Sequence, residues 1–155
     1  MTVRTRTILL RANALWLLLG SLGGLTVDLS GVLLARGPIG IVLRGSPDAA
    51  IGFVEAHGLA LICSVLLWRA APLRSWHLTG AAVHALLGTA NLVFWQLFVS
   101  GDVLLMGYVT TALHGVFAAL QLSAAFTAPH DHGLDSLTDF AARSSGAVPN
   151  NAWRP

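Results

Sequence analysis

Residues 12–35 read ANALWLLLGSLGGLTVDLSGVLLA, an apolar run that Arg11 precedes and Arg36 follows. Asp28 is the only charged residue within it. About 20 apolar residues, at about 1.5 Å of rise per helical residue, cross the ~30 Å hydrocarbon core of a bilayer. A helix satisfies its own backbone polar groups, as lipid requires. The stretch therefore predicts a transmembrane helix.

Three further apolar runs of similar length follow, at about residues 50–68, 77–99 and 103–126. The connections between the runs are short, and short connections force consecutive helices to lie antiparallel. The predicted fold class is therefore all-α: an integral membrane four-helix up-down bundle that occupies residues 12–126.

The composition indicates lipid rather than water around these runs. Of the 155 residues, 55% are hydrophobic and only 10% are charged, against about 25% charged in an average soluble domain. The net charge is only +2, and the Arg residues lie at the ends of the predicted spans instead of forming a basic patch. We therefore expect the lipid bilayer as the partner, and no nucleic acid.

The distribution of Arg predicts the orientation. Seven of the nine Arg residues fall on the side that carries both chain ends, and two on the other side. The positive-inside rule then places residues 1–11 and 127–155 in the cytoplasm. We expect a multi-pass protein of the cell membrane, with a polar, disordered cytoplasmic tail from residue 127 onward. His130, Asp131 and His132 of the tail could capture a metal ion, but such residues in a tail are usually only solvated.

Polar and ionisable side chains within the spans converge at one depth. Counted along each helix, they lie roughly 8–16 Å below the outer face, and they are Asp28, Glu55, His57, Asn91, Tyr108 and His114. Such side chains are costly in a bilayer, usually face the bundle interior and often mark function. The exception is His84, which lies nearer the cytoplasmic face and has no depth-matched partner. His77, at a span end, is expected at the membrane interface.

Helical spacing predicts which faces meet. Two stripes with small residues follow the third and fourth spans: Gly80, His84, Gly88, Asn91 and Trp95, and Gly107, Thr111, His114, Ala118 and Gln121. The small residues let two backbones approach, or leave room for a ligand. Glu55 and His57 are two residues apart, so their side chains point in nearly opposite directions.

The first functional hypothesis is a polar intramembrane pocket that binds or transforms a small apolar or lipid-like molecule. A carboxyl group in a low-dielectric environment, beside an imidazole that titrates near neutrality, suits the acid–base chemistry of an isomerase or cyclase without a cofactor. The candidate catalytic residues are Glu55, His57, His114 and Asp28. The candidate substrate-binding residues are Asn91, Tyr108, Thr111 and Trp95.

Two family resemblances accompany this hypothesis. The run from Arg11 to Trp16, RANALW, enters a Gly-rich first span that three short-linked spans follow, and it resembles small DoxX-like membrane proteins. Asp28 late in the first span and Glu55 early in the second are similar to the acids of sterol-isomerase-related four-helix proteins. Both resemblances cover residues 8–126, and the other catalytic positions of the isomerase pattern have no match here. They imply ligand binding or proton transfer within the membrane.

Two alternatives remain open. The first is a b-type haem protein, with His57 and His114 as axial ligands from different helices; each is followed by Gly, which would admit the macrocycle. The second is a non-catalytic subunit, in a homo-oligomer or a membrane complex, whose polar residues fix helix packing with its partners.

Overall fold

The computed structural model describes residues 1–44 and 47–128, and the described residues form helices without any strand. The helices, in chain order, are α1 (Val3–Leu34), α2 (Gly37–Leu43), the short 3₁₀ helix η1 (Pro47–Ala49), α3 (Ala50–Arg69), α4 (Arg74–Val93), α5 (Gln96–Ser100) and α6 (Leu104–Thr127).

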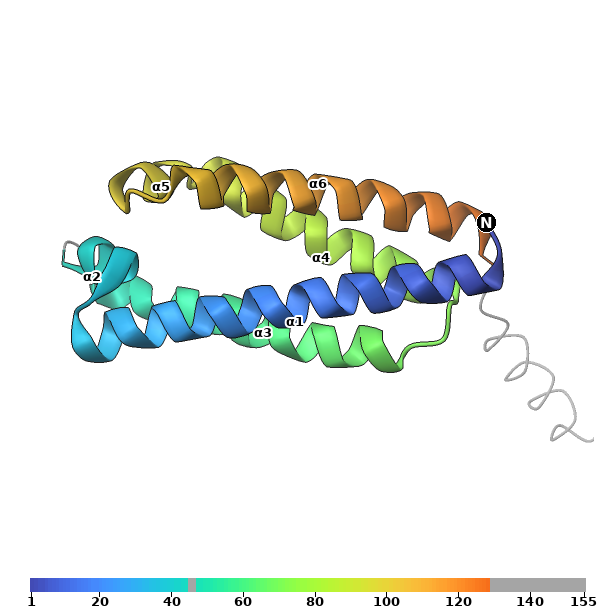
Figure 1. Cartoon of the computed structure of the whole chain (residues 1–155), viewed down its shortest axis with the longest axis horizontal. Coiled ribbons are helices and arrows are strands. Elements are labelled where there is room, and N and C mark those ends of the chain that lie inside the picture. Colours follow the sequence, from blue (N-terminus) through green and yellow to red (C-terminus); the bar gives the residue numbers. More distant parts are fainter. Residues whose placement is uncertain (45–46, 129–155) are drawn as a thin grey trace, which may run out of the picture.

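Among the described residues, four long helices, α1, α3, α4 and α6, lie side by side along the long axis of the molecule (Figure 1). α1 packs mainly against α3, and α4 packs mainly against α6. The short helices α2 and α5 touch each other at one end of the molecule, and the N-terminus lies beside the end of α6 at the other. These two ends are called the α2/α5 end and the N-terminal end below.

α1 extends nine residues further toward the N-terminus than the predicted span. It begins at Val3 because the Thr2 side chain caps it and accepts a hydrogen bond from the Thr5 backbone N–H at 3.2 Å. Arg6 then ties α1 to α6. Its Nη1 donates to the carbonyl oxygen of Thr127 at 2.7 Å, and its side chain is buried. The basic residues at the start of the chain therefore belong to a helix, not to an extended segment.

The predicted third span is interrupted. α4 ends at Val93, and Phe94 has non-helical backbone angles of φ −100° and ψ 30°. The next hydrogen bonds are the tighter three-residue type, with the Leu97 N–H donating to the Phe94 carbonyl and the Phe98 N–H to the Trp95 carbonyl. A single helix over residues 77–99 is therefore wrong: the helix covers Arg74–Val93 and a second, short helix follows it.

The buried apolar core lies toward the N-terminal end. Leu10, Ala14 and Leu17 of α1 meet Leu67 of α3 and Ala70 just after it. Elsewhere the long helices present large apolar side chains outward; Leu33, Leu105 and Phe126, for example, are 74%, 78% and 80% exposed. Exposed apolar side chains of this kind are typical of helices that face lipid or another protein.

The coarse prediction of an all-helical membrane protein agrees with the described residues. α1, α3 and α6 are each long and apolar enough to cross a membrane, as judged by length and composition. α4 is not among them, because it carries Arg74, His77 and other polar residues. The orientation of the termini stays a prediction. The predicted disordered tail, with His130–His132, lies outside the described residues from position 129 onward.

Candidate functional site

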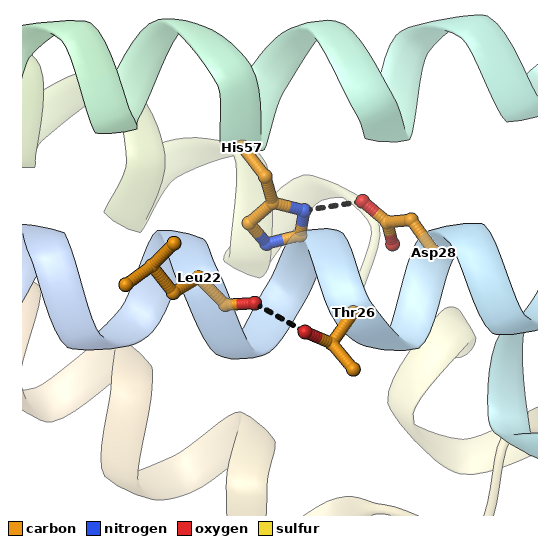
Figure 2. A network of polar contacts seen from close by, with 4 residues as sticks. All are labelled: Leu22, Thr26, Asp28 and His57. Atoms are coloured by element: carbon orange, nitrogen blue, oxygen red, sulfur yellow. Dashed lines mark hydrogen bonds and ion pairs between the residues drawn. The ribbon is translucent and has the colours of Figure 1, made fainter.

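Asp28 of α1 and His57 of α3 face each other between the two helices (Figure 2). The Nδ1 atom of His57 lies 2.6 Å from Oδ2 of Asp28. Gly24, one turn before Asp28, leaves the space that the ring occupies: a Cβ at position 24 would overlap the imidazole. The neighbouring Thr26 hydroxyl donates to the Leu22 carbonyl of its own helix and takes no part in the pair. The sequence thus provides a glycine and an acid on one face of α1 to receive one histidine.

The hydrogen bond fixes the chemistry of the imidazole. A carboxylate can only accept, so Nδ1–H of His57 donates to Asp28, and Nε2 of a neutral ring keeps its lone pair. The Asp28 side chain is 1% exposed, whereas that of His57 is 36% exposed. The carboxylate is therefore enclosed, while part of the His57 side chain is accessible and the Nε2 edge of its ring lies against Gly24. The pair can take a proton at Nε2, or return one from the protonated ring.

A second polar group lies among α1, α4 and α6, toward the N-terminal end. It is called the histidine–amide network and consists of Asn13, His77, His84, His114 and Gln121. Its centre is His84, whose Nε2 lies 2.6 Å from Oδ1 of Asn13 and whose Nδ1 lies 2.8 Å from Nδ1 of His114.

The hydrogen bonds of His84 determine its tautomer. An amide oxygen accepts, so Nε2–H of His84 donates to Asn13. Nδ1 of His84 must then accept, and Nδ1–H of His114 donates to it. Phe117 stacks on the His84 ring, with the ring centroids 5.0 Å apart and the planes at 14°. His84 is fully buried. The ring is therefore held on both edges and on one face, with no access for a ligand.

The other half of the network joins α4 to α6. Nδ1 of His77 lies 2.6 Å from Oε1 of Gln121, and both side chains are fully buried. Gly80 brings this half against Asn13: a Cβ there would lie 2.8 Å from Asn13 Nδ2 and 3.2 Å from Gln121 Cδ. Buried polar groups in contact across helices hold the helices together. The network links α1, α4 and α6.

The structure separates the four predicted catalytic residues. It brings Asp28 and His57 together. It places His114 in the histidine–amide network, bonded to His84. Glu55 is exposed on α3, and within the described residues it forms no hydrogen bond or ion pair with Asp28 or His57. The statement that His84 lacks a depth-matched partner is wrong, since His114 is its partner. His57 and His114, the haem alternative, are each bonded to a different residue and not to each other.

The predicted substrate-binding residues gather at the α2/α5 end of α4 and α6. Asn91 Nδ2 donates to the hydroxyls of Thr110 and Thr111 at 3.1 and 3.2 Å. The rings of Trp95 and Tyr108 lie 4.9 Å apart, and a shallow depression runs beside them and Thr111. Asn91 therefore joins two helices, while the two aromatic rings offer a surface for an apolar ligand.

Sequence reasoning missed three members of the network, Asn13, His77 and Gln121, as functional candidates. Gln121 stood in the predicted α6 stripe, and His77 precedes Gly80 by three residues, so that both lie on one face of α4. That spacing is the signal in the sequence that could have predicted a buried position for His77. It is fully buried between helices, while its expected position at the level of the membrane interface stays a prediction.

No protein-family model, curated protein or solved structure matches the chain. The resemblances to DoxX-like and sterol-isomerase-related proteins therefore stay predictions, and the candidate function depends on the residues of the two polar groups.

Proposed function

We propose that the chain is a four-span protein of the cell membrane, with both ends in the cytoplasm, whose Asp28–His57 pair performs acid–base chemistry on a small apolar or lipid-like molecule. In this proposal the four long helices run up and down across the bilayer, and α4 crosses as the most polar of them. Its polar residues are shielded by α1 and α6 through the hydrogen bonds of the histidine–amide network.

The contact between Asp28 and His57 is the observation that carries the proposal. A carboxylate that is 1% exposed, and whose hydrogen bond to Nδ1 fixes the tautomer of a partly exposed imidazole, is the arrangement that prepares Nε2 as a general base. Gly24 holds the ring on α1, with Nε2 against the helix. In this proposal the ring turns away from Gly24 so that Nε2 meets the substrate, while the exposed part of the His57 side chain leaves room for this movement.

The chemistry that suits this pair is the movement of a proton on carbon, as in an isomerisation. His57 Nε2 would remove a proton from a position activated by a neighbouring double bond or carbonyl group, and would return it at another carbon. The buried Asp28 carboxylate would stabilise the imidazolium formed between the two steps. No redox partner and no group donor enters this reaction. Its substrate would be an apolar molecule that reaches His57 from the lipid.

A substrate-independent experiment tests the proposal. Proteoliposomes that contain the full chain and total lipid extract of the source cells are incubated in ²H₂O, and the lipids are searched by mass spectrometry for deuterium bound to carbon. We expect the wild-type protein to label one lipid class. Asp28→Asn and His57→Gln should each lower the rate by at least about 100-fold, the contribution typical of a general base.

Glu55→Gln is the matched control, because it removes an exposed acid from the same helix and should leave labelling unchanged. Labelling that is equal in empty liposomes and in wild-type proteoliposomes would reject the acid–base reading. So would equal labelling by wild type and Asp28→Asn.

A further inference from the structure

A shallow groove follows the outer surface of α1 and α3 toward the N-terminal end of the molecule. Its walls are lined by Ala14, Leu15 and Leu18 from α1, and by Ser64, Val65, Trp68 and Arg69 from α3. The lining is almost entirely apolar and the groove is open to the surroundings of the helices. It is a different place from the Asp28–His57 pair, which lies further along the same two helices toward the α2/α5 end.

Two guanidinium groups stand at the end of this groove. Arg69 lines it directly, and Cζ of Arg11 lies 5.2 Å from the centroid of the Trp68 ring, which is part of its wall. Arg11 precedes Leu15 by four residues and Leu18 by seven, so it shares their face of α1. Positive charge and apolar wall thus form one continuous surface.

No acidic side chain balances the charge of this surface in the part of the chain that the structure describes. In the ranges 1–44 and 47–128, neither Arg11 nor Arg69 has a carboxylate within ion-pair distance. One donor, Nη1 of Arg11, is buried and has no hydrogen-bond acceptor there. Because Nη1 is enclosed by protein atoms, an anionic group would meet the other donors of Arg11 and those of Arg69. The two guanidinium groups therefore make the end of the groove suited to an anionic group.

We propose that the groove binds one anionic phospholipid, with its phosphate between Arg11 and Arg69 and the upper part of one acyl chain along Leu15, Leu18 and Val65. Guanidinium groups bind phosphate oxygens through paired, charge-assisted hydrogen bonds. Tryptophan favours the level where headgroup and acyl chain meet, which is the position of Trp68. The stretch from Arg69 back to Ser64 covers ~8 Å of helix, enough for the first carbons of a chain.

This inference requires that α1 and α3 lie in a membrane, and it holds for either orientation of the chain. It does not depend on any chemistry at Asp28 or His57. A protein partner is less suited to the groove, because the surface beside it, including Leu19 and Ile62, consists of exposed aliphatic side chains like the rest of the lipid-facing helices.

Native mass spectrometry of the detergent-purified full chain tests the proposal, with equimolar phosphatidylglycerol and phosphatidylcholine of identical acyl chains as probes. We expect one phosphatidylglycerol to remain bound, with an affinity about tenfold above that of phosphatidylcholine. Both lipids carry the phosphate, but the choline ammonium cancels the net charge of phosphatidylcholine and is repelled by the two guanidinium groups. Arg69→Gln and Arg11→Gln should each remove most of this preference. Arg36→Gln, an exposed Arg near the other end of α1, is the matched control and should leave it intact.

Leu15→Trp tests how much the apolar groove contributes to lipid binding, separately from the charge of the two Arg residues. The Leu15 side chain is about half exposed, so an indole there fills the groove without entering the core. It should weaken binding of both lipids while both Arg residues remain. Three results would overturn the proposal: equal retention of the two lipids by wild type, a preference that survives Arg11→Gln and Arg69→Gln together, or full displacement of the lipid by inorganic phosphate. Circular dichroism and size-exclusion profiles identify any variant that fails to fold.

Discussion

The Asp28–His57 pair and the histidine–amide network are both built from imidazoles that meet oxygen or nitrogen acceptors on a neighbouring helix, yet they differ in enclosure. In the network, His77 and His84 are fully buried, and Phe117 covers His84. In the pair, the His57 side chain is 36% exposed although Asp28 is 1% exposed. An enclosed imidazole can fix helices in place, but only an accessible one can meet a ligand.

The helices explain the difference. The network involves three helices, α1, α4 and α6, so each ring is surrounded, and Gly80 lets Asn13 and Gln121 approach the α4 backbone. The pair involves α1 and α3 only, and Gly24 leaves room for the Cδ2–Nε2–Cε1 edge of the ring, which lies against α1. We therefore expect changes in the pair to lower activity as well as stability, and changes in the network to lower stability.

The largest effect is expected for Gly24→Ala. Its Cβ would overlap the imidazole of His57 and force the ring away from Asp28. Deuterium incorporation should then fall by at least about 100-fold, as for loss of the base itself. The free energy of unfolding should also fall, by about 1–3 kcal/mol, because the buried Asp28 carboxylate loses its hydrogen-bond partner. The ring ¹⁵N spectrum of His57 should lose the signature of a hydrogen-bonded Nδ1–H.

Gly23→Ala is the control for this prediction, because a Cβ at position 23 has no neighbouring atom within 4 Å. It should leave both the labelling rate and the His57 spectrum as in wild type. If Gly24→Ala retained the wild-type spectrum, the seat of the ring on α1 would be wrong. If it lost the spectrum but kept the rate, the pair would not be the base.

The sequence could predict the members of the pair but not the pairing. Depth counting placed Asp28 and His57 at about 12 and 10 Å below the same face, and helical phase separated His57 from Glu55. Neither argument tells which helix lies beside α1, and depth counting admitted Glu55 and His114 equally. The choice depends on the packing of α1 against α3 at Gly24, and a glycine in an apolar helix is a packing signal that does not name its partner.

The histidine–amide network was not predicted from the sequence for a different reason. The third span was predicted over residues 77–99, which put His84 near one end, whereas α4 covers Arg74–Val93 and His84 lies near its middle. An error of a few residues in the predicted helix ends thus gave His84 the wrong depth, and His114 was not recognised as its partner. Helix ends without capping residues are the least certain feature of an apolar sequence. Because the depth of a residue is counted from a helix end, an error in that end becomes an error in the depth.

The second prediction concerns the network. Gly80→Ala places a Cβ 2.8 Å from Asn13 Nδ2 and 3.2 Å from Gln121 Cδ, so one of the two amides must move. Overpacking of this kind costs about 2 kcal/mol in free energy of unfolding. SDS titration of the protein in detergent micelles measures it. Gly115→Ala on α6, where a Cβ meets nothing within 4 Å, should be neutral. An equal loss in both variants would refute the close approach at Gly80.

A double-mutant cycle tests the central hydrogen bond of the network. Asn13→Ala and His84→Ala each remove one partner of the 2.6 Å contact. The coupling between the two changes should be about 1 kcal/mol, in the upper range for interhelical hydrogen bonds in membranes. The same cycle on Asp28 and His57 should give a larger coupling, because their 2.6 Å bond is made to a carboxylate and charge-assisted hydrogen bonds are stronger than neutral ones. Reversal of this order would contradict a charge-assisted bond between Asp28 and His57.

The smallest effect is expected for Asn91, which is less buried than His84 of the histidine–amide network. It is partly buried, and its Nδ2 donates to the hydroxyls of Thr110 and Thr111 across the α4–α6 contact. Asn91→Ala should lower the free energy of unfolding by about 0.6 kcal/mol, the average for such bonds. Gln96→Ala, which removes an exposed amide nearby, is the neutral control.

If Asn91 also binds the substrate, the deuterium-labelling rate of Asn91→Ala should fall at low lipid concentration and recover at high concentration. A stability loss with an unchanged labelling rate at every concentration would assign Asn91 to helix packing alone, because a ligand contact must appear in the concentration dependence.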